Sequence, residues 1–332
     1  MHIGKSYRLP EFLLWTRRNM FWPLIVGTIA TAFYQLLNLK WLAIPWTVVG
    51  LIGTATAFIV GFKNLQTYNR TWEARQIWGA AMSASRSWGI MSRDFFDSAE
   101  KSKEIIYRHF AWLTALRYQL REGRQWETTT KAHNREYKKF YSIPETEISL
   151  KEELAKYISN DELEYILTTK NRAGQLLSLQ SKTIKELYDT GLIDDLKFSA
   201  MHEAVRDFFG HQGRSERIKN FPYPRQYAII NTIFVKLFCF LLPFGMLGEF
   251  DKLNEGISGF LFGKMVWLVI PFSVLISWIY TSLEQVGEST ENPFEGGAND
   301  VPISQMSRIA EIDIREMLGE TDLPPALQPK NN

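Results

Sequence analysis

The sequence predicts an all-α membrane protein with four transmembrane helices per chain and a cytoplasmic helical domain. Four long apolar runs lie in two pairs, one pair near each end of the 332 residues. A long polar segment separates the pairs, and its apolar residues recur at helical spacing without sustained strand alternation. Lysine and arginine gather next to the runs on the side of this polar segment, which predicts that the segment faces the cytoplasm.

The four apolar runs are residues 20–39, 41–62, 227–248 and 260–283. The second run, Trp41 to Phe62, contains no charged residue and at about 1.5 Å per helical residue covers roughly 33 Å, enough to cross a hydrocarbon core of about 30 Å. The third and fourth runs are interrupted by Lys236 and Lys264. We expect both lysines to extend toward the membrane surface, and for Lys236 a contact with a pore or a partner is the alternative.

Two stripes of side chains, each with a spacing of four residues, run along the second apolar run. One stripe is small throughout and consists of Gly53, Ala57 and Gly61. The neighbouring stripe consists of Thr54, Phe58 and Phe62. Small residues let another helix approach closely, so the first stripe is expected to pack against a helix. If several copies surround an axis, the second stripe lines that axis as a dry constriction, and otherwise its aromatic rings face protein or lipid.

The runs divide the chain into four parts. We expect the N-terminal segment with the first two spans at 1–63, a cytoplasmic helical domain at 64–225, the last two spans at 226–283 and a cytoplasmic C-terminal segment at 284–332. Four spans would place both termini in the cytoplasm. The predicted location is the cell membrane, as a multi-pass protein of the bacterial inner membrane.

Within the polar segment, local signals predict where helices begin and end. The helical period continues without a break from Lys63 to Phe96, so one helix should run from the membrane into the cytoplasm. Ser149 and Glu152 form a capping-box pattern that opens a later helix. Gly191 and Gly210 are predicted to end helices, and residues 128–148 are predicted to form a loop.

The sequence contains no recognisable enzyme motif. The five histidines show no zinc-like spacing, the single cysteine lies in an apolar run, and no phosphate-binding loop, dinucleotide fingerprint or nucleophile elbow is present. A net charge of +2 argues against a nucleic-acid partner. The expected partners are the lipid bilayer, other copies of the chain and ions, with no enzymatic activity.

Three stretches resemble the bestrophin family, in particular its bacterial members. They are GFKNLQTYNRTWEARQIWG (Gly61 to Gly79), YPRQYAIINTIFVKLFCFLLPFGMLG (Tyr223 to Gly248) and ENPFEGGANDVPISQMSRIAEIDIREML (Glu291 to Leu318). The resemblance covers nearly the whole chain in the same order, although the middle segment is similar mainly in its helical character.

This resemblance implies a homopentameric ion channel with one central pore. The residues that line the narrow membrane neck of the family fall here on Thr54, Phe58 and Phe62, the stripe identified above. A second, cytoplasmic constriction would lie on the helix at residues 171–191, at Leu176 with Gln175 as the alternative. The conducted ions are monovalent: chloride and other anions by the family resemblance, with monovalent cations as the possibility found in the bacterial branch.

The family's calcium site follows an Asn-Pro-Phe element with a run of acidic residues. This chain has Glu295-Gly-Gly-Ala-Asn-Asp300 at that place, so the candidate ligands are Glu295, Asn299 and Asp300. Because calcium prefers six to eight oxygen ligands, no tight site and no cofactor are expected, and Asp300 could instead cap the loop.

Two other function classes are compatible with a set of membrane helices. The chain could be a membrane-anchored scaffold or sensor that binds a cytoplasmic partner without conducting ions. A carrier with alternating access would predict internal repeats with broken helices at matching positions, and the sequence has none.

Overall fold

A computed structural model describes residues 8–138, 141–256, 259 and 262–328. The regular elements of these residues are all helices, which confirms the predicted all-α class. The α-helices are α1 (Leu9–Thr16), α2 (Phe21–Leu36), α3 (Trp46–Asp94), α4 (Ala99–Arg121), α5 (Ala132–Tyr137), α6 (Pro144–Glu147), α7 (Leu150–Leu154), α8 (Asn160–Thr168), α9 (Arg172–Asp189), α10 (Asp195–Asn220), α11 (Arg225–Lys252), α12 (Val269–Ser289) and α13 (Ile303–Met317). Short 3-10 helices lie at η1 (Arg17–Met20), η2 (Lys40–Leu42), η4 (Leu253–Gly256) and η5 (Met265–Leu268).

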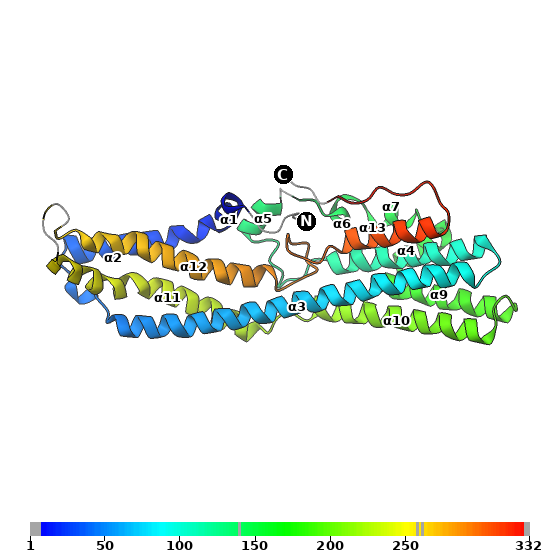
Figure 1. Ribbon diagram of the computed structural model, residues 1–332, viewed down its shortest axis with the longest axis horizontal. Helices are drawn as coiled ribbons and strands as arrows, with labels where there is room; N and C mark the ends of the chain where they lie inside the picture. The colour runs from blue at the N-terminus through cyan, green and yellow to red at the C-terminus, as the bar shows by residue number, and fades with distance from the viewer. Residues whose placement is uncertain (1–7, 139–140, 257–258, 260–261, 329–332) are drawn as a thin grey trace.

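Helix α3 runs through both halves of an elongated molecule (Figure 1). Its 49 residues correspond to roughly 74 Å at about 1.5 Å per residue, more than twice the thickness of a hydrocarbon core. The predicted continuation beyond Lys63 is confirmed: the helix contains no proline and ends at Asp94, with Phe95 as its C-cap. The boundary expected after residue 63 therefore falls inside one continuous helix.

Helices α11 and α12 lie along the first half of α3, and α2 packs on α11 and α12 (Figure 1). Their shared core is apolar and includes Val49 and Val60 of α3 and Val235 and Leu242 of α11. Helices α3, α11 and α12 are each long and apolar enough to cross a membrane. Helix α2 has 16 residues, fewer than the roughly 20 that a span needs, so three of the four predicted spans meet this criterion in the described part of the chain.

The predicted fourth span also starts later than expected. Its first residues, Phe260 and Leu261, lie outside the described residues, and regular helix begins at Met265 with η5 and continues as α12.

Helices α4, α10 and α13 pack along the second half of α3, and α9 packs on α4 and α10 (Figure 1). Three fully buried tryptophans, Trp78, Trp88 and Trp112, lie in the core of this half. His109 is buried next to Trp88 and Trp112, with its Nε2 2.9 Å from the Ser85 hydroxyl, and burial lowers its pKa to about 3. This histidine is therefore a neutral core residue at physiological pH.

The helix-end predictions had mixed outcomes. The capping box is confirmed, since Ser149 Oγ accepts from the Glu152 amide at 3.3 Å and Glu152 Oε2 accepts from the Ser149 amide at 3.2 Å. Gly191 follows α9 at a φ of +72°, as a helix-ending glycine should. Gly210 is wrong as a helix end: it lies inside α10, where the buried neighbours Phe208 and His211 hold the helix, and a helical glycine costs only about 1 kcal/mol relative to alanine.

The loop predicted at residues 128–148 is partly wrong, because it contains the short helices α5 and α6. Pro144 is the first residue of α6, a position where its missing N–H costs no hydrogen bond. Helix α5 is connected to α1 by a hydrogen bond of 3.4 Å from Trp15 Nε1 to Asn134 Oδ1. Such short helices depend on tertiary contacts, and these contacts cannot be predicted from the spacing of apolar residues in the sequence.

Candidate functional site

The stripe predicted from spacing points away from the rest of the chain. Phe58 is 82% exposed and Phe62 is 51% exposed, and Thr54 is exposed as well. The Thr54 hydroxyl donates to the carbonyl of Gly50 at 3.0 Å, so its polar group is satisfied by its own helix. The surface that these three residues present to the outside is therefore apolar.

The exposed apolar face is longer than the predicted stripe. Leu51, seven residues before Phe58, is 73% exposed, and Leu65 and Trp72 continue the same helical face beyond Phe62. Sequence reasoning missed these three residues, although a spacing of three, four or seven residues connects each of them to the stripe. At one edge of this face, the Phe62 ring lies 6.5 Å from that of Tyr227 in α11.

The stripe of small residues is divided between two environments. Gly53 is buried against α11, where an added Cβ would lie 2.6 Å from Cε2 of Phe238. Ala57 is exposed. A Cβ added to Gly61 would have no atom of another described segment within 4 Å. Of the three small residues, only Gly53 packs against another helix of the chain, and Ala57 and Gly61 are uncovered.

The structure contradicts Leu176 as a constriction residue. Its side chain is fully buried in the core of the cytoplasmic half, and a side chain enclosed in one protomer cannot line an opening between protomers. Gln175 is half-buried, and its Oε1 accepts a hydrogen bond of 3.0 Å from Tyr165. The exposed face of α9 instead carries Ser178, Lys182 and Lys185.

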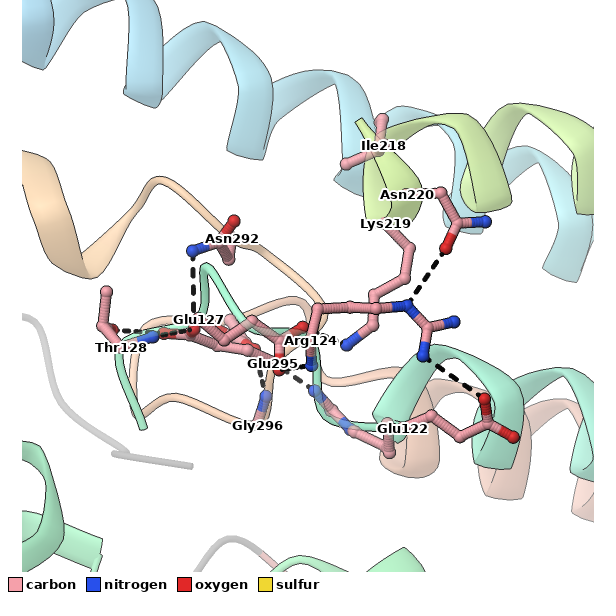
Figure 2. Close-up of polar contacts among 12 residues, drawn as sticks. Glu122, Arg124, Glu127, Thr128, Ile218, Lys219, Asn220, Asn292, Glu295 and Gly296 are labelled. Atoms are coloured by element: carbon pink, nitrogen blue, oxygen red, sulfur yellow. Dashed lines mark hydrogen bonds and ion pairs between the residues drawn. The ribbon is translucent and has the colours of Figure 1, made fainter. Parts of the chain in front are cut away.

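The candidate calcium ligands lie in the loop that follows α12. Glu295 is buried and accepts from both the amide and the hydroxyl of Thr128, at 2.8 and 2.7 Å, while Asn292 donates to it at 3.5 Å. Figure 2 shows these groups together with the neighbouring ion pair of Lys219 and Glu127. Glu295 therefore connects this loop to the segment after α4.

Asp300 is also engaged within the protein. Its Oδ2 accepts from the Gly296 amide at 2.6 Å and lies 3.2 Å from Nη1 of Arg121. Asn299 donates to Ser289 at 3.4 Å. No cluster of three or more metal-binding side chains occurs among the described residues. The carboxylates of Glu295 and Asp300 are occupied by contacts within the chain, which does not fit the six to eight oxygen ligands of a calcium ion. The bond from the Gly296 amide to Asp300 is of the kind that a loop cap makes.

Burial determines the protonation of this loop. Burial and the negative charge of Asp300 together raise the pKa of Glu295 to about 8, although the hydrogen bonds from Thr128 act in the opposite direction. The pair therefore holds a proton on Glu295 near neutral pH.

Arg70 is a structural residue that sequence reasoning did not single out. From α3 it donates to the carbonyl of Glu291 at 2.8 Å and to the carbonyls of Ile218 and Phe221. Lys63, also in α3, lies 3.7 Å from the Glu291 carboxylate. These contacts attach two connecting segments to α3: the one between α10 and α11, and the one that follows α12.

The family model described as Bacterial/Fungal Bestrophin protein matches residues 14–316. This chain belongs to the bestrophin family. Among its relatives, the "voltage-dependent anion channel-forming protein YneE" of Escherichia coli (strain K12) is 26% identical over 297 residues, covering 90% of this bestrophin and 84% of the relative. A protein of the same descriptive name from Mesorhizobium japonicum, mll4386, is 23% identical over 283 residues, covering 85% of this chain and 78% of its own.

The fold of this bestrophin is also that of solved structures. A bacterial bestrophin homolog from Klebsiella pneumoniae matches with a TM-score of 0.76 at 23% identity, covering 93% of this chain and 99% of that one. The expected family and all-helical fold are thus confirmed, and the apolar helices and the membrane-channel relatives support a membrane protein.

Proposed function

We propose that this bestrophin is one subunit of a homopentameric anion channel of the bacterial inner membrane. The observation that carries the proposal is the exposed apolar face of α3, with Thr54, Phe58 and Phe62 one helical turn apart and no charged side chain among them. The pore would be the space that five copies of this face enclose. The relatives named as anion channel-forming proteins support the function class, and the number of copies rests on the family resemblance.

In this proposal, the width of the neck and the presence of water in it determine whether ions can pass. Rings of phenylalanine offer no polar ligand to replace the water around an ion, so a partly hydrated monovalent ion must pass between them. A narrow apolar neck empties of water and stops conduction, and a small outward movement of α3 would refill it. Thr54, whose hydroxyl is bound to its own helix, would line the far end of the neck.

The charges on α3 favour anions over cations in such a pore. The helix contains five basic residues and two acidic ones, and Lys63, Arg86 and Arg93 form ion pairs. Arg75 is exposed at the edge of the apolar face and has no ion-pair partner within the described ranges. Five copies of this guanidinium would produce a positive potential at the cytoplasmic side of the neck, which concentrates anions there.

The test is a reversal potential. Purified protein is reconstituted in planar bilayers with KCl at unequal concentrations on the two sides, and the voltage of zero current is measured. A reversal potential near the Nernst potential of chloride supports the proposal. A value near that of potassium overturns the anion assignment, and absence of any current together with absence of salt flux from liposomes supports the scaffold or sensor reading.

The proposed orientation places both termini and the α4, α9, α10 and α13 half in the cytoplasm. It includes four spans, with α2 and the preceding η1 together forming a continuous helical segment of 20 residues from Arg17 to Leu36. Protease digestion of inside-out membrane vesicles should cleave the polar half, and right-side-out vesicles should protect it.

A further inference from the structure

Two cavities meet at the ends of α2, α11 and α12 nearest the cytoplasmic half. Each has a volume of about 600 Å³, and Asn19, Lys236 and Thr281 line both. One cavity opens between α2, α11 and α12. The other lies where α11 and α12 meet the segment that follows α4. The shared lining residues make them one continuous cleft.

The two parts of the cleft have opposite character. The part between the spanning helices is lined by the exposed apolar residues Trp22, Leu237 and Phe240. The other part is lined by charged residues: Lys63, Lys131, Arg225, Lys236, Glu284, Glu288 and Glu291. An occupant that fits both parts is amphipathic, with a polar head and an apolar tail.

In the charged part of the cleft, the ion pairs do not neutralise all of the basic side chains. Lys63 pairs with Glu291 and Lys131 with Glu288. Glu284 accepts a hydrogen bond of 2.6 Å from Thr232. Arg225 and Lys236 form no ion pair or hydrogen bond through their side chains with any residue that the structure describes. Two free cations against one carboxylate favour a head with a negative charge.

The position of Lys236 calls for a polar partner at its ammonium group. It lies in the middle of a helix long and apolar enough to span a membrane, about 24 Å from the end of α11 at Lys252. A lysine at such a depth is costly unless water or an anion meets its ammonium group. Its side chain is exposed in the cleft, at the border between the apolar and the charged part.

We propose that this cleft binds one anionic glycerophospholipid of the leaflet next to the cytoplasmic half. The phosphate lies on Lys236 with Arg225 in support, and an acyl chain follows Trp22, Leu237 and Phe240. The inference requires that the chain spans a membrane, but it does not require ion conduction.

The test is native mass spectrometry of the whole assembly in mild detergent, titrated with phosphatidylglycerol or with phosphatidylcholine. The wild type should bind phosphatidylglycerol in preference. Lys236→Met should reduce this binding about fivefold, the effect of roughly 1 kcal/mol for one basic residue near a lipid phosphate. The matched control is Lys252→Met on the same helix, where the lysine is exposed and paired with Glu249, and it should leave the preference unchanged.

A second variant keeps the test independent of the folding of Lys236→Met. Phe240→Ala removes part of the apolar wall, so it should weaken binding of both lipids and keep the preference for phosphatidylglycerol. Equal binding of phosphatidylglycerol to wild type, Lys236→Met and Phe240→Ala overturns the proposal. Full competition by soluble glycerol 3-phosphate also overturns it, because the cleft would then be a site for free phosphate compounds.

Discussion

Neighbouring residues of α3 have opposite environments. Gly53 is pressed against Phe238, whereas Phe58, just over one turn later, leaves most of its surface uncovered. A phenylalanine that its own chain leaves uncovered can face lipid, pack against another copy or form part of the apolar wall of a pore.

Replacing Phe58 or Phe62 by alanine should raise the single-channel conductance severalfold. Each substitution widens a ring of the neck in all copies at once and makes its wetting easier. Phe33→Ala is the control, because Phe33 is an exposed phenylalanine on α2 rather than on α3. Equal conductance of both neck variants and the wild type in planar bilayers would count against a neck at these residues.

Gly53→Ala and Gly61→Ala should differ in their effect on stability. The new methyl group at position 53 would collide with Phe238, and overpacking of this kind costs about 1–3 kcal/mol, whereas position 61 has open space in the protomer. Thermal unfolding of the detergent-solubilised protein should show a lower melting temperature for Gly53→Ala alone. A matching loss in Gly61→Ala without any change in assembly would contradict this packing.

At the scale of elements, the loop after α12 should make stability depend on pH. Glu295 has a pKa of about 8 in the folded chain against an ordinary value of 4.5, so the folded state holds a proton that the unfolded state releases. The free energy of unfolding should therefore fall as pH rises from about 4.5 to about 8. Glu295→Gln should flatten this dependence in thermal melts, and an unchanged slope would show that Glu295 is not its source.

Long periodic elements could be predicted from the sequence, and elements held by tertiary contacts could not. The continuous α3 follows from an unbroken helical period, and the start of α7 follows from the Ser149–Glu152 capping box. Helices α5 and α6 are too short to show a period. Gly191 and Gly210 have the same local signal, and only the packing of α10 on α3 distinguishes them.

The candidate site was predictable to a similar degree. Spacing alone placed Phe58 and Phe62 on one face, and both are exposed on α3. For Leu176 the prediction depends on a resemblance in a segment that is similar mainly in helical character. Such a resemblance predicts the helix α9, but it does not predict that Leu176 lies on the buried face of that helix. The ammonium group of Lys236 was expected at the membrane surface, and the cleft around it depends on three helices that only the fold brings together.

At the scale of the whole molecule, the exposed apolar face and the uncovered Ala57 and Gly61 predict association of copies. A pentamer would have a protein mass of about 193 kDa, five times 38.6 kDa. Light scattering coupled to size exclusion, corrected for bound detergent, should give this mass. A monomer or dimer in mild detergent would contradict the pentamer.

The most direct test of the central claim is cysteine accessibility during current recording. The chain suits it because its single cysteine, Cys239, is buried and should leave the wild type insensitive to charged thiol reagents. A negatively charged methanethiosulfonate should change the current through Phe58→Cys and Phe62→Cys and leave a Phe33→Cys control unaffected. Modification of Phe58→Cys and Phe62→Cys, verified by mass spectrometry, without any change in current would contradict a pore lined by this face of α3.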